Sequence, residues 1–161
     1  MDTGDTIMKH CPLLFTFTDR VSGNGFLADI VAHGRALAVQ EGEAEHWFYG
    51  VNPGGLAAVG TDESNAYLEF RKEYTLVLHE IAEDVKTFAE FKAEVDRFFS
   101  ETNVPTEQEW KRAVEAVRAG RISAKGIPRL PAESPRFVEV TERIHFSVND
   151  NTLDVRPAIA A

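Results

Sequence analysis

Histidine, cysteine and carboxylate side chains are the groups from which catalytic or metal chemistry would be built in this sequence. The five histidines are scattered, and no two of them have the helical spacing of a zinc protease. His79 and Glu83 lie one helical turn apart, and His10 precedes Cys11, so either pair could supply two metal ligands. No cysteine cluster accompanies them, and we interpret His79 and Glu83 as a surface pair. The sequence therefore predicts no metal site.

Nucleophilic chemistry has equally little support in the sequence. Cys11 is the only cysteine, so an intramolecular disulfide is excluded, and no base is identifiable beside its thiol. The chain lacks a G-x-S-x-G elbow, and no Gly-Lys-Ser/Thr follows the glycines of residues 52–55. We therefore expect a protein that is not an enzyme and has no cofactor. One alternative stays open, an enzyme with an unrecognised site between sheet and helices, near Trp47, Tyr49 and His79.

Composition and charge restrict the class of partner. The 161 residues are 43% hydrophobic, enough for a core, and the net charge is −9 with a pI near 5.0. Such a charge disfavours binding to phosphate backbones, so nucleic acid is an unlikely partner by itself, and it favours a basic partner. The apolar runs are too short for a membrane span, and the early acidic residues argue against a signal peptide. We expect a cytoplasmic location.

The charge is unevenly distributed along the chain. Residues 62–101 contain eleven acidic and five basic residues, whereas residues 111–143 contain eight basic and four acidic ones. The basic stretch 118–136 includes Arg121 and Arg129 and has few aromatic residues, so we favour a role in complementing the acidic helices. A contact with a partner is the alternative, and the sequence does not decide between them.

The first sixty residues have the alternation and turn residues of an antiparallel meander. Ser22–Gly25 and Asn52–Gly55 are turn sequences, and residues 40–45 form a polar reversal. The expected strands, the second of them bent near Gly34, are Leu13–Thr18, Phe26–Val39, Trp47–Val51 and Leu56–Val59.

Three helices are predicted to follow the strands. Asp62 is a suitable N-cap for the first, and capping boxes predict that the second begins at Thr87 and the third at Thr106. Gly120 is suited to end the third helix. The apolar positions recur every three or four residues. The predicted buried faces are Ala66, Phe70, Tyr74, Val77 and Ile81; Phe88, Phe91, Val95, Phe98 and Phe99; and Trp110, Ala113, Val114 and Val117.

The composition changes at Arg121, which suggests an organisation in two parts. Three prolines fall within residues 128–135 and prevent regular helix there, while residues 137–148 show strand alternation over part of their length. We expect an α+β domain over residues 1–120, with an antiparallel sheet and helices packed on one face. Residues 121–161 are expected to form a proline-containing extension with one strand.

The run WFYGVNPGGLAAVGTDESNAYLEFRKEYTLVL combines an aromatic strand, a Pro-Gly turn, a short strand, a glycine and a long helix. In this order of features, residues 36–82 resemble the N-terminal domain of HicB-type antitoxins. Gly55 matches the turn glycine, Gly60 the glycine before the helix, Asp62 the capping position and Ala66 the alanine near the helix start. The two glycines fall where the chain must reverse, and Ala66 allows the helix to approach the sheet closely.

The resemblance has limits that concern DNA binding. Val51–Gly54 replaces the Pro-Asp-x-Pro of the family, and Ser64 and Asn65 replace an acidic pair. No C-terminal helix-turn-helix or ribbon-helix-helix segment is identifiable, so operator binding is not expected. The resemblance implies a truncated ribonuclease-H-like fold without catalytic carboxylates. It also implies that the protein neutralises a small, basic toxin ribonuclease.

The sequence is therefore consistent with two hypotheses for a non-catalytic binding protein. The first is a HicB-like antitoxin whose partner is a small basic protein. The second is a stand-alone, homo-oligomeric interaction protein that associates through an exposed sheet edge. The candidate partner-binding residues combine acidic side chains of the first two helices with two basic residues of the extension, and they are Glu69, Glu73, Glu80, Glu90, Glu94, Arg121 and Arg129.

Overall fold

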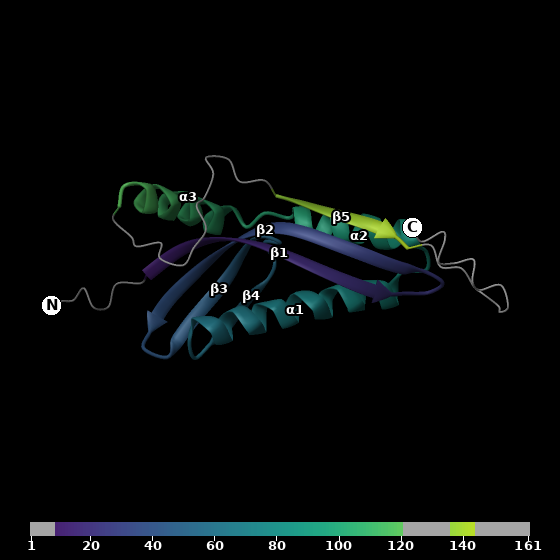
Figure 1. Cartoon of the computed structure of the whole chain (residues 1–161), viewed down its shortest axis with the longest axis horizontal. Helices are drawn as coiled ribbons and strands as arrows, with labels where there is room; N and C mark the ends of the chain where they lie inside the picture. The colour runs from purple at the N-terminus through teal and green to yellow at the C-terminus, as the bar shows by residue number, and fades with distance from the viewer. Residues whose placement is uncertain (1–8, 121–135, 144–161) are drawn as a thin grey trace, which may run out of the picture.

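The computed structural model describes residues 9–120 and 136–143 (Figure 1). The central strand of its sheet is β2 (Leu27–Gly42), which pairs with three other strands. β1 (Lys9–Ser22) pairs antiparallel with β2 along its whole length. The other edge of β2 is shared by two shorter strands placed end to end. β3 (Glu45–Asn52) pairs with residues 35–42, and β5 (Phe137–Glu142) pairs with residues 28–33. β4 (Ala57–Gly60) adds to β3.

The predicted α+β class and antiparallel meander are confirmed. β1 and β2 are longer than the sequence indicated, because they continue through Lys9 and Gly42, where the apolar alternation has ended. The bend expected near Gly34 corresponds to a register shift between Arg35 and Ala36, opposite the end of β3. The predicted strand of the extension is β5, and it belongs to the same sheet as the meander. Residues 144–148 of that prediction lie outside the described residues.

The larger hydrophobic core lies between one face of the sheet and the helices α1 (Glu63–Asp84) and α2 (Phe88–Ser100). Alternate residues of β1 and β2, such as Phe15, Phe17 and Ile30, point into it. Phe70 is fully buried, and its ring lies 4.7 Å from that of Phe48 and 5.7 Å from that of Phe15, measured between centroids. The aromatic residues therefore form a continuous layer between sheet and helices.

α1 buries a row of residues spaced four apart. This row consists of Ala66, Phe70, Tyr74, Leu78 and Ala82, and all five are buried. The predicted face placed Val77 and Ile81 there instead, and both are only half-buried. A row spaced by four is inclined to the helix axis, so burying it sets the helix at an angle that suits a twisted sheet.

The start of α2 is as predicted, because the Thr87 hydroxyl accepts a hydrogen bond from the Glu90 N–H at 3.1 Å. Phe91, Val95 and Phe99 are buried, and Phe88 and Phe98 pack against the same core at its margin. The last two side chains are half-buried.

The predicted start of α3 is wrong. α3 (Val104–Arg118) begins two residues before Thr106, and its N-cap is Asn103, whose side chain accepts from the Thr106 N–H at 3.1 Å. Pro105 lies in the first turn, where an N–H has no helical partner and a fixed φ suits the helix. Gly120 follows the helix with φ 75°, as its predicted role requires.

α3 differs from the other two helices in the face of the sheet that it covers. Trp110, Ala113 and Val114 form a separate small core with Leu37, Val39 and Val51. These sheet residues alternate with those of the larger core, so they point to the opposite face. The prediction that the helices pack on one face is therefore wrong, because α1 and α2 cover one face of the sheet and α3 covers the other.

The chain passes from one face to the other at residues 101–103. The Gly54 N–H donates to the Glu101 carbonyl at 2.8 Å, and the Asn103 N–H donates to the Val51 carbonyl at 3.2 Å. A Cβ on Gly54 would lie 2.3 Å from the Asn103 nitrogen, so only glycine permits this contact. The crossing therefore runs against the end of β3, beside the place where β5 begins.

Candidate protein-binding site

The predicted acidic residues of α1 lie along its solvent side. Glu73 and Glu80 are exposed and Glu69 is half-buried. Within residues 9–120 and 136–143, no basic side chain forms an ion pair with any of the three. We name Glu69, Glu73 and Glu80 the α1 acidic row. Its charge is thus open to an external cation.

Exposed leucines accompany this row, and the sequence interpretation did not select them. Leu68 is 59% exposed and Leu76 is 46% exposed. Both leucines belong to a row of residues that recur every four positions along the side of α1 opposite its buried row. Leu76 lies among the three glutamates on the helix surface. Sequence periodicity could have found them, since neither fits the buried face.

The acidic residues of α2 have local partners. The Glu90 carboxylate accepts a hydrogen bond from the Lys86 N–H at 2.8 Å, which helps to begin the helix. Glu94 pairs with Arg97 one turn later. A neighbouring pair, Lys92 and Asp96, lies 3.0 Å apart. Glu90 and Glu94 therefore present less free charge than the α1 acidic row.

Arg121 and Arg129, the two predicted basic contacts, lie outside the described residues. The ends of the basic stretch contact α3 rather than the acidic helices. Arg118 lies 3.5 Å from Glu115, and Arg136 lies 3.9 Å from Glu107. Both acidic partners belong to α3, whereas the sequence predicted that the basic stretch would complement the acidic helices α1 and α2.

The predicted structural positions at the start of α1 have distinct roles. The Asp62 side chain accepts from the Asn65 N–H at 2.7 Å and caps the helix. A Cβ on Gly60 would lie 2.4 Å from the Ala66 nitrogen, so Gly60 and Ala66 bring helix and strand into close contact. Gly55 is different, since its nearest neighbour would be a Glu101 carboxylate oxygen at 3.9 Å. Its neighbour Gly54 is the crowded glycine of this turn.

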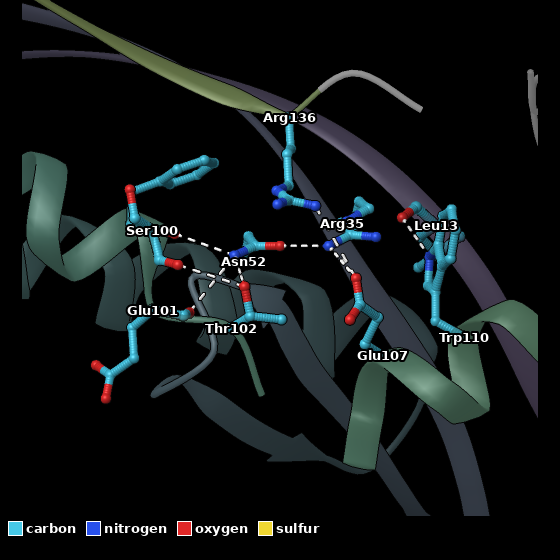
Figure 2. Close-up of polar contacts among 10 residues, drawn as sticks. Leu13, Arg35, Asn52, Ser100, Glu101, Thr102, Glu107, Trp110 and Arg136 are labelled. Atoms are coloured by element: carbon cyan, nitrogen blue, oxygen red, sulfur yellow. Dashed lines mark hydrogen bonds and ion pairs between the residues drawn. The ribbon is translucent and has the colours of Figure 1, made fainter. Parts of the chain in front are cut away.

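A buried polar network joins β2, β3 and α3 at the crossing (Figure 2). Arg35 is 4% exposed and donates to the Asn52 side-chain oxygen at 2.6 Å and to Glu107 at 2.8 Å. Asn52 is fully buried and donates to the Thr102 hydroxyl at 2.9 Å and to the Phe99 carbonyl at 3.3 Å. The network therefore fixes the crossing segment and the first turn of α3.

Trp110 adds a second attachment of α3 to the sheet. The Arg35 guanidinium lies 5.3 Å from the centre of the Trp110 ring, and the indole N–H donates to the Leu13 carbonyl at 3.3 Å. Figure 2 shows that these contacts gather at one end of α3, beside Arg136. The hydrogen bond from Arg35 holds the pKa of Glu107 below its ordinary value, while burial lowers the pKa of Arg35. Glu107 is thus the negatively charged partner that Arg35 requires.

This network stabilises the fold, and its polar groups are used in contacts within the chain. Apart from the Arg35 Nε, its buried side-chain groups have partners within the chain. The three residues proposed for an enzymatic site near Trp47, Tyr49 and His79 do not converge. Trp47 and Tyr49 pack against the core of α3, whereas His79 is exposed on α1, across the sheet.

The remaining reactive groups are likewise separate. Burial, together with the negative charge of the nearby Glu63, raises the pKa of Cys11 to about 11, so the thiol is a poor nucleophile at neutral pH. In the part of the chain that the structure describes, no three His, Cys, Asp or Glu side chains gather in a group that could hold a metal ion. Among the described helices, none has the length and apolar character needed to span a membrane.

The free edge of β1 is the main unpaired strand edge among the described residues, since β4 has only four residues. It is partly occupied by α1. Arg71 donates to the Thr18 carbonyl at 3.1 Å and pairs with Asp19 at 2.9 Å, and its guanidinium lies 4.3 Å from the Phe17 ring centre. A side chain on an edge carbonyl hinders the addition of another strand.

Comparison with known proteins does not assign this chain to a family. No family model matches its sequence, and neither a curated protein nor a solved structure was found to match it. The function is therefore inferred from the contacts, burial and charges of the described residues.

Proposed function

We propose that this protein is a HicB-like antitoxin that acts by binding and neutralises a small, basic toxin ribonuclease. The observation that carries the proposal is the α1 acidic row, whose carboxylates have no ion-pair partner in the described residues and which runs beside two exposed leucines. Apolar anchors supply affinity at an interface, and charge steers the encounter and selects the partner.

Two further features support the proposal. The net charge of −9 is opposite to that of a basic ribonuclease, so long-range attraction favours association. The close contact of Gly60 with Ala66, after the cap at Asp62, gives the resemblance to the antitoxin family a physical basis. In this role the protein acts by covering the toxin, and it needs no catalytic group.

An antitoxin of this kind requires a small basic protein encoded beside it, and the test is whether such a protein binds this chain. We expect a stable complex by calorimetry that weakens as salt rises, together with loss of the partner's ribonuclease activity. Replacing Glu69, Glu73 and Glu80 by Gln should weaken binding about tenfold, since each exposed charge contributes up to about 1 kcal/mol.

The matched control removes three charges elsewhere, at Asp96, Glu109 and Glu115, each of which already has a basic partner. This variant should bind within about twofold of the unmodified chain. Absence of any complex with the unmodified chain would end the antitoxin proposal. Equal loss in both triple variants would show that only net charge matters.

A homo-oligomer that pairs through β1 is the second candidate, because β1 has fourteen residues and one unpaired edge in the described structure. Light scattering on concentrated protein distinguishes it from the first. A dimer that Arg71→Ala strengthens would support edge pairing, since that change exposes the Thr18 carbonyl. A strict monomer would exclude it.

A further inference from the structure

A second surface with binding chemistry lies at the end of β3, on the face of the sheet that carries α3. Trp47 and Tyr49 are two residues apart in one strand, so their side chains point to the same face. Val59 pairs with Trp47, and Ala57 pairs with Tyr49, which places all four on that face. We name these four residues the Trp47 patch. Val59 is 44% exposed, and the two rings are half-buried against the core of α3.

The two aromatic rings are parallel and rigidly placed. Their centroids lie 5.4 Å apart with an angle of 8° between the planes. The indole N–H of Trp47 donates to a Glu45 oxygen at 3.0 Å, and the Tyr49 hydroxyl lies 3.4 Å from a Glu41 oxygen. Burial raises the pKa of Tyr49, as does the negative charge of Glu41, so the phenol is neutral at physiological pH. The structure thus holds two carboxylates beside a stack of rings.

Both carboxylates have capacity for another donor. Glu41 and Glu45 are exposed, and neither forms an ion pair within the described part of the chain. Each contact with an aromatic residue uses one oxygen, so the other can accept a hydrogen bond. A cation placed here would meet both an aromatic face and a negative charge.

Among protein side chains, arginine fits this combination best. Its planar guanidinium stacks on aromatic rings and donates hydrogen bonds in a fork that matches a carboxylate. The ammonium group of lysine is more strongly hydrated and has no plane to stack. A symmetric contact with a second copy of this chain does not fit, because it would bring the same carboxylates against Glu41 and Glu45.

We propose that the Trp47 patch, with Glu41 and Glu45, binds an arginine side chain presented by a basic protein. The inference rests on the proposed function, for which it names a specific contact with the partner. The patch and the α1 acidic row lie on opposite faces of the sheet, with the edge strand β4 between them. A partner that contacts both surfaces therefore passes around β4.

The test follows the two tryptophan indole N–H signals of the full chain by NMR, assigned with Trp47→Phe. Tri-arginine amide is titrated at constant ionic strength. The Trp47 signal should shift and saturate, while that of the buried Trp110 should stay in place. Tri-citrulline amide, which keeps the planar shape without the charge, should produce no saturable shift.

Isosteric changes identify the carboxylates that take part. Glu41→Gln and Glu45→Gln should each raise the dissociation constant of tri-arginine about threefold, which is typical of one exposed ion pair. Glu43→Gln is the matched control, because Glu43 is exposed in the same hairpin and contacts neither ring. A static Trp47 signal, an equal response to tri-citrulline or an equal effect of Glu43→Gln would overturn the proposal.

The same variants separate this inference from the proposed function. If the neighbouring toxin fails to bind while tri-arginine shifts the Trp47 signal, the arginine site stands without the antitoxin role. If the toxin binds with the same affinity to the unmodified chain and to the double variant Glu41→Gln with Glu45→Gln, the patch is not its contact. The inference is then wrong even though the antitoxin role holds.

Discussion

The two faces of the sheet are held to their helices by different physical means. α1 and α2 rest on a large core of apolar side chains, with Phe70 and Leu78 completely buried. α3 rests on a small core that borders a buried arginine, a buried asparagine and a glutamate. Apolar burial tolerates changes in pH and salt, whereas an ion pair depends on both. The difference shows how one domain can combine a stable body with a helix that responds to its surroundings.

The largest expected effect on stability comes from a change in the face of the sheet that carries α1 and α2. Phe70→Ala removes the ring at the centre of the aromatic layer and leaves a cavity, and should lower the free energy of unfolding by about 3–5 kcal/mol. Denaturant unfolding monitored by circular dichroism measures it. Leu68→Ala, in the same helix but 59% exposed, should change stability by less than about 0.5 kcal/mol. Similar losses in the two variants would contradict this account of the core.

Glu107→Ala should selectively weaken the attachment of α3 to its face of the sheet. The change leaves Arg35 buried without its carboxylate and should cost about 2 kcal/mol, less than for a fully buried pair because the Glu107 side chain is 20% exposed. Hydrogen exchange should show early loss of protection in α3, with β1 and α1 unaffected. Replacing Arg35 by Met together with Glu107 by Leu should recover most of the stability. Uniform loss of protection would show that the two faces are not independent.

The two glycines matched to the antitoxin family, Gly60 before α1 and Gly55 in the turn after β3, can be compared by substitution. Gly60→Ala places a Cβ 2.4 Å from the Ala66 nitrogen, so α1 must shift, at a cost of about 1–2 kcal/mol. Gly55→Ala meets no atom closer than 3.9 Å and should stay within about 0.5 kcal/mol. Thermal unfolding of both variants provides the measurement. A larger loss at Gly55 than at Gly60 would contradict this account of the two positions.

The smallest expected effect is a pH response confined to the face of the sheet that carries α3. Arg35 lowers the pKa of Glu107 below the ordinary value near 4.5, so the stabilisation is complete above that value and is lost as the pH falls through the folded-state pKa. In a Trp47→Phe background, Trp110 fluorescence should therefore change on acidification before the sheet unfolds. Adding Glu107→Gln should remove this early change, which also separates it from titration of Asp29, whose pKa Arg143 and Arg20 lower.

The parts of the fold that the sequence predicted are those determined locally. Alternation and turn residues located the four strands of the meander, and the caps at Asp62 and Thr87 located two helix starts. The start of α3 was misplaced because Thr106 and Glu109 have the spacing of a capping box, whereas the actual N-cap is Asn103, three residues earlier, with Pro105 in the first turn.

Long-range features could not be read from spacing alone. The pairing of β5 with β2 joins residues more than one hundred positions apart, and no local pattern encodes it. The same is true of Arg35, which appears in the sequence as one charge within an apolar run. Among the candidate binding residues, the sequence prediction grouped the glutamates of α1 with those of α2, although the three-residue spacing of Glu94 and Arg97 in a helix indicates a local ion pair.

The end-to-end placement of β3 and β5 along β2 constrains the order in which the chain assembles. Until β5 pairs, the crossing at residues 101–103 needs only to pass around an open sheet edge. Once Phe137 lies opposite His33, the same passage is confined to the gap between β3 and β5. Docking of β5 after α3 has reached its face avoids this confinement. Synthesis from the N-terminus favours this order, since α3 leaves the ribosome before β5 does.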